Sequence, residues 1–170
     1  MSLPHKKLHP IFGAKLLDTD LRAIKPNVIE KFLDLMDEHA VCAVPHKVPL
    51  TNEQHIKFSK MLGPIERSVK KTPGTGERLP FDEIIDQSNL GPEGALFKEG
   101  DRRLAFKRAN RLWHTDMSFY RIRATYSVLS AHIVPPEGGN TELIDMRTVY
   151  RDLPDKMKKR LVNMSAEHCY

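Results

Sequence analysis

His114 and Asp116 stand two positions apart in RLWHTDMSF, residues 111–119, among several apolar and aromatic side chains. Alternate side chains of a β-strand point to the same face, so in a strand this imidazole and this carboxylate would converge. One imidazole and one carboxylate are two of the three ligands in the facial triads that bind non-haem Fe(II) and leave other coordination positions open. The pair therefore predicts part of a metal site that still needs a second histidine.

The spacing alone leaves other interpretations open, namely a catalytic acid/base pair or an ordinary surface strand. With 8 histidines in 170 residues, roughly 0.5 such His-x-Asp pairs are expected by chance. No other histidine is selected as the missing ligand. His132 falls in a predicted strand, where a core or sheet role is the alternative, and His168 lies on or just after a predicted helix.

Several catalytic signatures of other enzyme classes are missing from the sequence. It contains no G-x-S-x-G nucleophile elbow, no H-E-x-x-H zinc motif, no paired cysteines and no Walker A or dinucleotide-binding glycine pattern. The sequence therefore gives no support to a serine hydrolase, a zinc hydrolase or a nucleotide-binding enzyme.

The elements that would position the pair are predicted from periodicity and punctuation. Residues 26–39 have apolar side chains at helical spacing after a proline suited to the first turn, and residues 40–44 form a short apolar run typical of a buried strand. TNEQ, residues 51–54, is a capping box that opens a second helix, which Gly63 and Pro64 should end.

The second half of the chain is predicted to be richer in strands. The order of elements favours an α+β fold with a mainly antiparallel sheet. A segment rich in glycine and proline separates the halves and is predicted to be a loop that covers a site, with disorder of part of it as the alternative. The predictions are a loop at 66–104 with one strand at 81–86, ordered chain at 111–119, strands at 125–134 and 141–145, and a helix at 155–164.

The composition is that of a single globular domain. The chain has 170 residues, 40% of them hydrophobic and 29% charged, and a formal net charge of +5. Because the basic residues are dispersed, we expect a solvated surface that favours small anions rather than a nucleic-acid partner. No apolar run approaches the ~20 residues of a membrane span, and the N-terminus lacks the apolar region of a secretory signal. With two cysteines and no export signal, a cytoplasmic location is expected.

Longer stretches of the sequence carry a resemblance to a known family. NRLWHTDMSF, residues 110–119, followed by ATYSVLSAHIVPPEGGNTELIDMRTVY, residues 124–150, resembles the taurine dioxygenase family of Fe(II)/2-oxoglutarate-dependent oxygenases. The N-terminal stretches LHPIFGAKLLDTDLR, DEHAVCAVP and LTNEQHIKFSKMLGPIE also resemble that family. The resemblance covers nearly the whole chain, and within the family it is strongest to the branch that acts on aryloxyalkanoates such as dichlorophenoxyacetate.

The resemblance implies a fold, cofactors and residue roles. The implied fold is a double-stranded β-helix, or jelly roll, with flanking helices, and the implied cofactors are Fe(II), 2-oxoglutarate as cosubstrate, and O2. His114 and Asp116 match the family's catalytic metal ligands, and Thr141 in the GGNT turn matches a threonine that binds the distal carboxylate of 2-oxoglutarate. Asn110 matches a position near the substrate, and Lys71 falls where aryloxyalkanoate enzymes carry a lysine that meets the substrate carboxylate.

The implied reaction hydroxylates a small anionic organic substrate, with release of succinate and CO2. The best match is an aryloxyalkanoate, while taurine, alkyl sulfates and purine-type substrates stay open. The family's distal histidine and its 2-oxoglutarate-binding arginine match no position here, so residues 1–170 are expected to be the N-terminal portion of a single oxygenase domain whose C-terminal portion is absent. The jelly roll is therefore expected to be incomplete in this chain. The alternatives are a truncated, non-catalytic family member, or a complete enzyme whose third ligand comes from a partner chain, and a homo-oligomer stays open.

Overall fold

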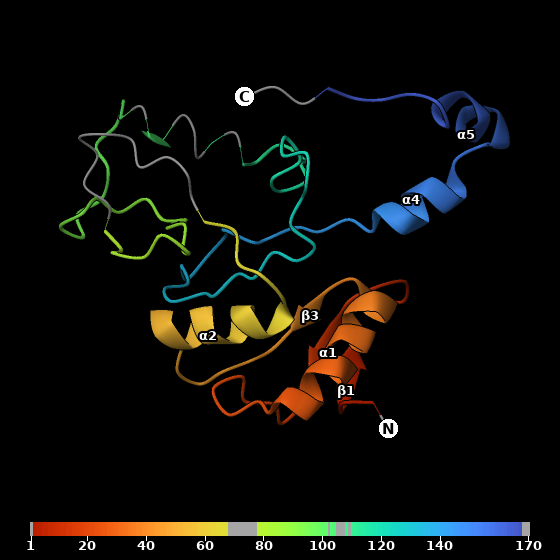
Figure 1. Ribbon diagram of the computed structural model, residues 1–170. Helices are drawn as coiled ribbons and strands as arrows, with labels where there is room; N and C mark the ends of the chain where they lie inside the picture. The colour runs from red at the N-terminus through yellow and green to blue at the C-terminus, as the bar shows by residue number, and fades with distance from the viewer. Residues whose placement is uncertain (1, 68–77, 102, 105–107, 109, 168–170) are drawn as a thin grey trace. The chain divides into compact units, whose positions relative to one another are not determined.

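The computed structural model describes residues 2–67, 78–101, 103–104, 108 and 110–167. The chain divides into two compact units, one made of residues 1–62 and 129–170 and the other of residues 63–128. The first unit contains the following helices and strands, most of which are labelled in Figure 1. In chain order these are β1 (His5–Lys7), β2 (Ala14–Leu16), α1 (Pro26–His39), β3 (Cys42–Ala43), α2 (Asn52–Leu62), α4 (Met146–Asp152) and α5 (Asp155–Leu161).

A three-stranded sheet with the order β1-β2-β3 forms the N-terminal part of the first unit. β1 pairs with β2 in antiparallel register, with His5 opposite Leu16, and β2 pairs with β3 in parallel register, with Ala14 opposite Cys42. Ala14 and Leu16 are buried while Lys15 between them is exposed, which is the alternation expected of a strand with one covered face. β1 and β2 were not among the elements predicted from the sequence.

The two long helices follow the predicted signals closely. Helix α1 begins at Pro26 and ends at His39, and the left-handed backbone of Ala40 caps it by donating a hydrogen bond to Met36 O. The capping box of α2 is confirmed, because Thr51 N donates to Gln54 Oε1 at 2.9 Å and Gln54 N donates to Thr51 Oγ1 at 3.3 Å. The helices meet through Phe32 and Phe58, whose rings pack edge to face with centroids 5.5 Å apart.

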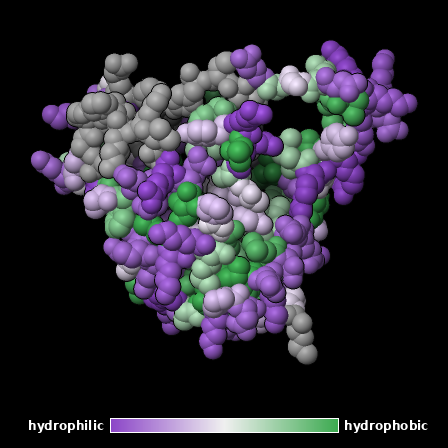
Figure 2. All heavy atoms as spheres, in the orientation of Figure 1, coloured by the Kyte–Doolittle hydropathy of each residue, from purple (hydrophilic) through white to green (hydrophobic). Residues whose placement is uncertain are grey.

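The hydrophobic core is built from these N-terminal elements. Its buried apolar side chains come from β2, α1, the segment before α2, and α2 itself: Ala14, Leu16, Ile29, Phe32, Leu35, Leu50 and Phe58. Figure 2 shows apolar side chains at the surface between the charged ones. No helix among the described residues is long and apolar enough to cross a membrane.

The strands predicted for the second half are not formed in the described residues. Residues 81–86, 111–119, 125–134 and 141–145 take no strand assignment, and residues 90 and 96 form only an isolated bridge. A strand needs a neighbouring strand to receive its backbone hydrogen bonds. Ile133, which a covered sheet would bury, is 78% exposed. The strand predictions for these segments are therefore wrong for the described residues.

The prediction at the C-terminal end is correct in type and wrong in length. A helix was expected over residues 155–164, whereas α5 ends at Leu161. Met157 and Leu161 lie on the same face of the predicted helix, and they are 41% and 39% exposed. Because no apolar surface in the described part of the chain covers this face, the last predicted turn gains nothing from packing.

Candidate metal site

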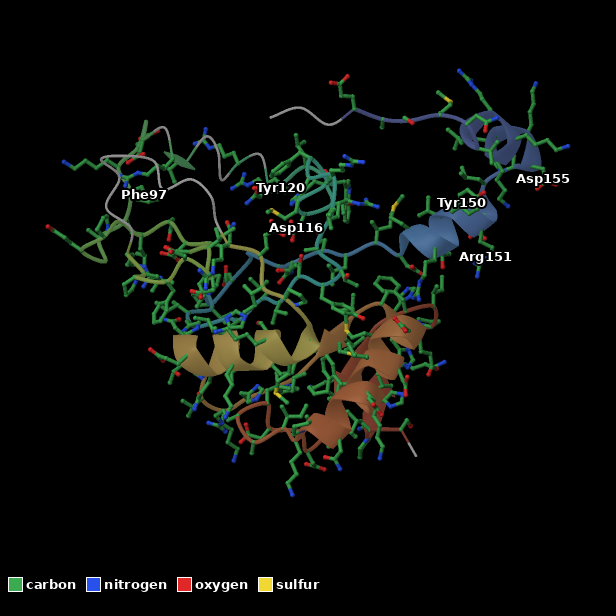
Figure 3. All side chains as sticks on the ribbon, viewed as in Figure 1. Phe97, Asp116, Tyr120, Tyr150, Arg151 and Asp155 are labelled. Carbon is green, nitrogen blue, oxygen red and sulfur yellow. The ribbon has the colours of Figure 1, made fainter. Side chains whose placement is uncertain are left out.

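The side chains of His114 and Asp116 converge, as the spacing predicted. His114 Nε2 lies 3.3 Å from Asp116 Oδ1, and both side chains are about half exposed. The predicted route to this convergence is wrong, because residues 111–119 are turns and irregular chain rather than a strand. Met117 instead takes a left-handed backbone with φ of 54°, and Tyr120 N donates to Met117 O at 3.1 Å. A turn directly after Asp116 therefore ends the segment, and Figure 3 shows Asp116 and Tyr120 in this part of the chain.

The hydrogen bonding of His114 leaves its Nε2 lone pair toward the carboxylate. Nδ1 lies 2.7 Å from the backbone oxygen of Leu112. A carbonyl oxygen can only accept, so Nδ1 donates to it, and in the neutral imidazole this leaves the lone pair on Nε2. A metal-ligating histidine commonly donates its other ring N–H to a backbone carbonyl in this way, which fixes the ring and its tautomer.

In the neutral imidazole, Nε2 and Oδ1 are two acceptor atoms 3.3 Å apart, and a proton or a metal ion between them would remove their repulsion. Two ligand atoms at about 2.1 Å from one metal ion, in neighbouring positions of an octahedron, lie roughly 3 Å apart. The His114 and Asp116 atoms therefore have the separation and the donor types that a divalent metal ion such as Fe(II) requires. No group of three or more metal-ligating side chains occurs among the described residues, so a third ligand is not placed.

Asn110 lies in the same unit as the pair and is held by a side chain that the sequence did not single out. Asn110 Nδ2 donates to Gln87 Oε1 at 3.3 Å. Gln87 sits between Asp86 and Ser88, and Ser88 Oγ donates to Asp86 Oδ2 at 3.1 Å. No sequence motif marks Gln87, and only the folded chain brings residues 23 positions apart into contact.

A charged pair anchors the segment that carries Gln87. Arg78 donates from Nε and Nη2 to the two carboxylate oxygens of Asp86, at 2.7 and 3.0 Å. This contact raises the pKa of the Arg78 guanidinium, chiefly through the hydrogen bond to Asp86. A bidentate pair fixes direction as well as distance. The Arg78–Asp86 pair therefore fixes the chain next to Gln87.

The remaining predicted site residues lie elsewhere. Thr141 is exposed and belongs to the unit of residues 1–62 and 129–170, four positions before Asp145, which caps α4. Lys71 and His168 fall outside the described residues. Sequence reasoning also missed Asp145 and Arg147, although an aspartate directly before a helix is a recognisable N-cap signal.

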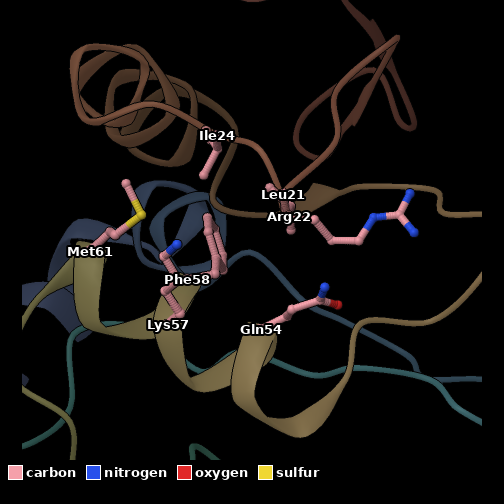
Figure 4. Close-up of a pocket in the computed structure, with 7 residues that line it drawn as sticks. All are labelled: Leu21, Arg22, Ile24, Gln54, Lys57, Phe58 and Met61. Carbon is pink, nitrogen blue, oxygen red and sulfur yellow. The ribbon is translucent and has the colours of Figure 1, made fainter.

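One pocket lies apart from the predicted residues, between the segment of residues 21–24 and helix α2 (Figure 4). Its volume is about 150 Å³, and its apolar wall includes Phe58 and Met61 while Arg22 and Lys57 supply positive charge. Arg22 is engaged by Asp20, whose pKa its guanidinium lowers to about 2. None of the predicted site residues lines this pocket.

Comparison with known proteins places the chain in a family. Residues 4–170 match the family model "Taurine catabolism dioxygenase TauD, TfdA family". The chain is 38% identical over 169 residues to the alpha-ketoglutarate-dependent 2,4-dichlorophenoxyacetate dioxygenase of Cupriavidus pinatubonensis, covering 99% of this chain and 58% of that protein. It is 30% identical over 174 residues to the (S)-phenoxypropionate/alpha-ketoglutarate-dioxygenase of Sphingobium herbicidovorans, covering 95% of this chain and 54% of that protein.

A solved structure confirms the predicted fold class. The crystal structure of AAD-2 in complex with Mn(II) and N-oxalylglycine superposes with a TM-score of 0.87 at 34% identity, over 95% of this chain and 56% of that chain. The chain therefore has the predicted fold class, a jelly roll with flanking helices, of which the described residues form helices and one three-stranded sheet. The chain spans a little over half the length of each of these relatives.

Proposed function

The chain belongs to the taurine catabolism dioxygenase TauD/TfdA family, and from this premise we propose that it forms part of an Fe(II)- and 2-oxoglutarate-dependent dioxygenase. The observation that carries the proposal is the convergence of His114 Nε2 and Asp116 Oδ1 at 3.3 Å, with Nδ1 hydrogen-bonded to the Leu112 carbonyl. The proposal takes residues 1–170 as the N-terminal portion of one oxygenase domain, and it includes the cytoplasmic location expected from the sequence.

Different residues of this chain bind the metal ion and 2-oxoglutarate in this proposal. His114 and Asp116 hold the metal ion by one nitrogen and one oxygen, and the Leu112 carbonyl keeps the histidine in the tautomer that can ligate. The Thr141 hydroxyl donates to the distal carboxylate of 2-oxoglutarate. When bound, the metal ion and 2-oxoglutarate use O2 to hydroxylate a substrate C–H bond, with succinate and CO2 as the other products.

The substrate in this proposal is a small organic anion, with an aryloxyalkanoate such as dichlorophenoxyacetate as the leading candidate. Two relatives with sequences similar to this chain are named for phenoxyacetate and phenoxypropionate substrates. The net charge of +5 also favours an anion. Asn110, held by Gln87, and Lys71 are the proposed substrate-binding residues, and hydroxylation next to the ether oxygen would release a phenol and glyoxylate from an aryloxyacetate.

Two experiments test this proposal. Anaerobic titration of the chain with Fe(II) and 2-oxoglutarate should produce the metal-to-ligand charge-transfer band, and His114→Ala should remove it. Under O2, succinate release should be stimulated most by aryloxyalkanoates in a screen that also contains taurine, alkyl sulfates and purines. Absence of both the band and succinate would sink the proposal for this polypeptide and favour the alternative of a truncated, non-catalytic family member. Stimulation by another class would overturn only the substrate assignment.

A further inference from the structure

A buried carboxylate interrupts an otherwise exposed stretch of chain after the GGNT turn. Residues 135–144 are all exposed, and Leu143 and Ile144 are 52% and 54% exposed. Asp145, the next residue, is only 9% exposed. Apolar side chains are usually buried and carboxylates exposed, and here the order is the opposite. A buried carboxylate is stable only where its charge is hydrogen-bonded. Asp145 is therefore the buried end of this exposed segment of the first unit.

Asp145 is fully engaged by the first turn of helix α4. Its Oδ2 accepts from Thr148 Oγ1 at 2.8 Å, and its Oδ1 accepts from the Nε of Arg147 at 3.0 Å and from the Arg147 backbone N–H at 3.2 Å. Together these contacts lower the pKa of the Asp145 carboxyl, with the Thr148 hydrogen bond as the largest cause. Asp145 thus starts the helix and aligns the Arg147 side chain at the same time.

The guanidinium of Arg147 reaches from α4 to the end of a different helix. Nη1 donates to Asp37 O, and Nη2 donates to Glu38 O at 3.4 Å, 109 positions earlier in the chain. These carbonyls belong to the last turn of α1, where backbone oxygens lack partners within the helix and the helix dipole favours a cation. We call this arrangement, from Asp145 through Arg147 to the end of α1, the Asp145–Arg147 clasp.

The other side of Thr141 is also fixed. Gly138 and Gly139 both have left-handed backbones, with φ of 70° and 69°. A Cβ built on Gly139 would lie 3.0 Å from Pro135 Cγ, so the turn closes tightly on the proline. Thr141 therefore lies between a turn that only glycine adopts easily and a clasp that attaches to α1.

We propose that Arg147 is a positioning residue that, through Asp145, holds Thr141 in place for the distal carboxylate of 2-oxoglutarate. This inference rests on the proposed function for the role of Thr141, but the clasp itself is independent of it. Only three residues separate Thr141 from Asp145, so releasing the clasp frees one end of a stretch roughly 13 Å long at most. Arg147 touches neither metal ion nor cosubstrate in this role.

The first test measures order in the chain without any ligand. Backbone amide order parameters for residues 140–144 should fall in Arg147→Ala from values near those of rigid backbone, about 0.85, toward the flexible range below about 0.6. Arg151→Ala is the matched control, because Arg151 is on the same helix and pairs with its neighbour Asp152 at 2.8 Å (Figure 3). Unchanged order parameters in Arg147→Ala would overturn the inference.

Arg147→Lys is a conservative second variant, which keeps the test usable if Arg147→Ala fails to fold. Lysine keeps the cation near the end of α1 but lacks the planar fork that reaches a carboxylate and two carbonyls together. Its order parameters should lie between those of the wild type and Arg147→Ala. If Arg147→Lys matches the wild type, charge alone suffices and the fork-mediated link through Asp145 is refuted.

The second test measures affinity for 2-oxoglutarate in the Mn(II)-loaded chain by calorimetry. Arg147→Ala should weaken binding on the order of tenfold, as a small misplacement of a positioned group can. Thr141→Val, which removes only the hydroxyl, should weaken it as well, and the double variant should lose little more than Thr141→Val alone. Additive losses would refute the claim that Arg147 acts through Thr141.

The outcomes separate this inference from the proposed function. If Thr141→Val weakens binding and Arg147→Ala does not, the inference fails while the role of Thr141 stands. If Thr141→Val has no effect, the proposed role of Thr141 fails, and Arg147 then positions nothing for the cosubstrate. If the wild type binds no 2-oxoglutarate, the proposed function fails for this polypeptide and the order parameters alone decide the inference.

Discussion

The Nε2 atom of His114 faces the Oδ1 atom of Asp116 across 3.3 Å, and neither atom has a hydrogen to donate when the imidazole is neutral. Such a contact is unfavourable by itself and becomes favourable when a cation lies between the two atoms. The Leu112 carbonyl favours this arrangement because it accepts a hydrogen bond from Nδ1, which leaves Nε2 as the lone-pair nitrogen of the neutral imidazole. The local fold therefore brings together the two side chains that we propose as metal ligands, and no third candidate lies beside them among the described residues.

Removing either ligand should weaken binding of a divalent metal ion. His114→Ala and Asp116→Ala should each raise the dissociation constant for Mn(II), measured by electron paramagnetic resonance, by more than the roughly 10–100-fold that loss of an outer-shell partner costs. His132→Ala is the control, because His132 is exposed and is not part of the pair. Equal effects from all three substitutions would mean that Mn(II) binds histidines without selecting this pair.

The left-handed backbone of Met117 gives a second prediction about the same site. A residue other than glycine pays about 1–2 kcal/mol for this conformation, and a β-branched residue fits it worst. Met117 has φ of 54°. Met117→Val should therefore weaken Mn(II) binding by disturbing the turn after Asp116, whereas Met117→Gly should retain it. Retention of full affinity in Met117→Val would show that the turn does not control the pair.

The sequence predicted the helices well because their signals are local. Pro26 at the first turn of α1 and the Thr51–Gln54 capping box of α2 each act within a few residues of the helix they start. The convergence of His114 and Asp116 was also predicted, but from strand alternation, whereas the structure achieves it with a turn at Met117. The side chains of residues i and i+2 can converge either in a strand or at a turn.

The rest depended on contacts between distant parts of the chain. The strand predicted at residues 125–134 needs a partner strand, and none is formed for it in the described residues. Arg147 meets the end of α1 from more than 100 positions away, and Gln87 meets Asn110 from 23 away. No periodicity or spacing within one sequence encodes such pairs, so the clasp and the support of Asn110 emerged only from the folded chain.

The capping box of α2 should contribute measurably to stability. Thr51→Ala removes the oxygen that accepts from Gln54 N, and loss of such a cap costs about 1 kcal/mol of unfolding free energy. Urea denaturation followed by circular dichroism would measure it. Ser59→Ala in the same helix is the control, because the Ser59 hydroxyl only bonds back to His55 O and alanine is the better helix former. A loss of the same size from Ser59→Ala would contradict the assignment of the effect to the cap.

The Asp145 carboxyl should make the stability of the first unit depend on acid. Its pKa is lowered from an ordinary value of 3.8, so the folded state binds its proton less readily than the unfolded state does. The stability it contributes is therefore complete above about pH 4 and is lost as the pH falls through the lowered pKa. Asp145→Asn should be less stable than the wild type near neutral pH and should show a shallower loss of unfolding free energy below about pH 4.

Asp155→Asn provides the comparison for this pH profile. Asp155 is also at the start of a short helix, but its side chain is 91% exposed and its nearest cation, Lys158, is 4.0 Å away. Because an exposed pair at this distance contributes little, the substitution should leave the slope of unfolding free energy against pH almost unchanged. Should the two asparagine variants flatten the acid limb equally, the effect would come from net charge, and the specific contacts of Asp145 with Thr148 and Arg147 would not be its cause.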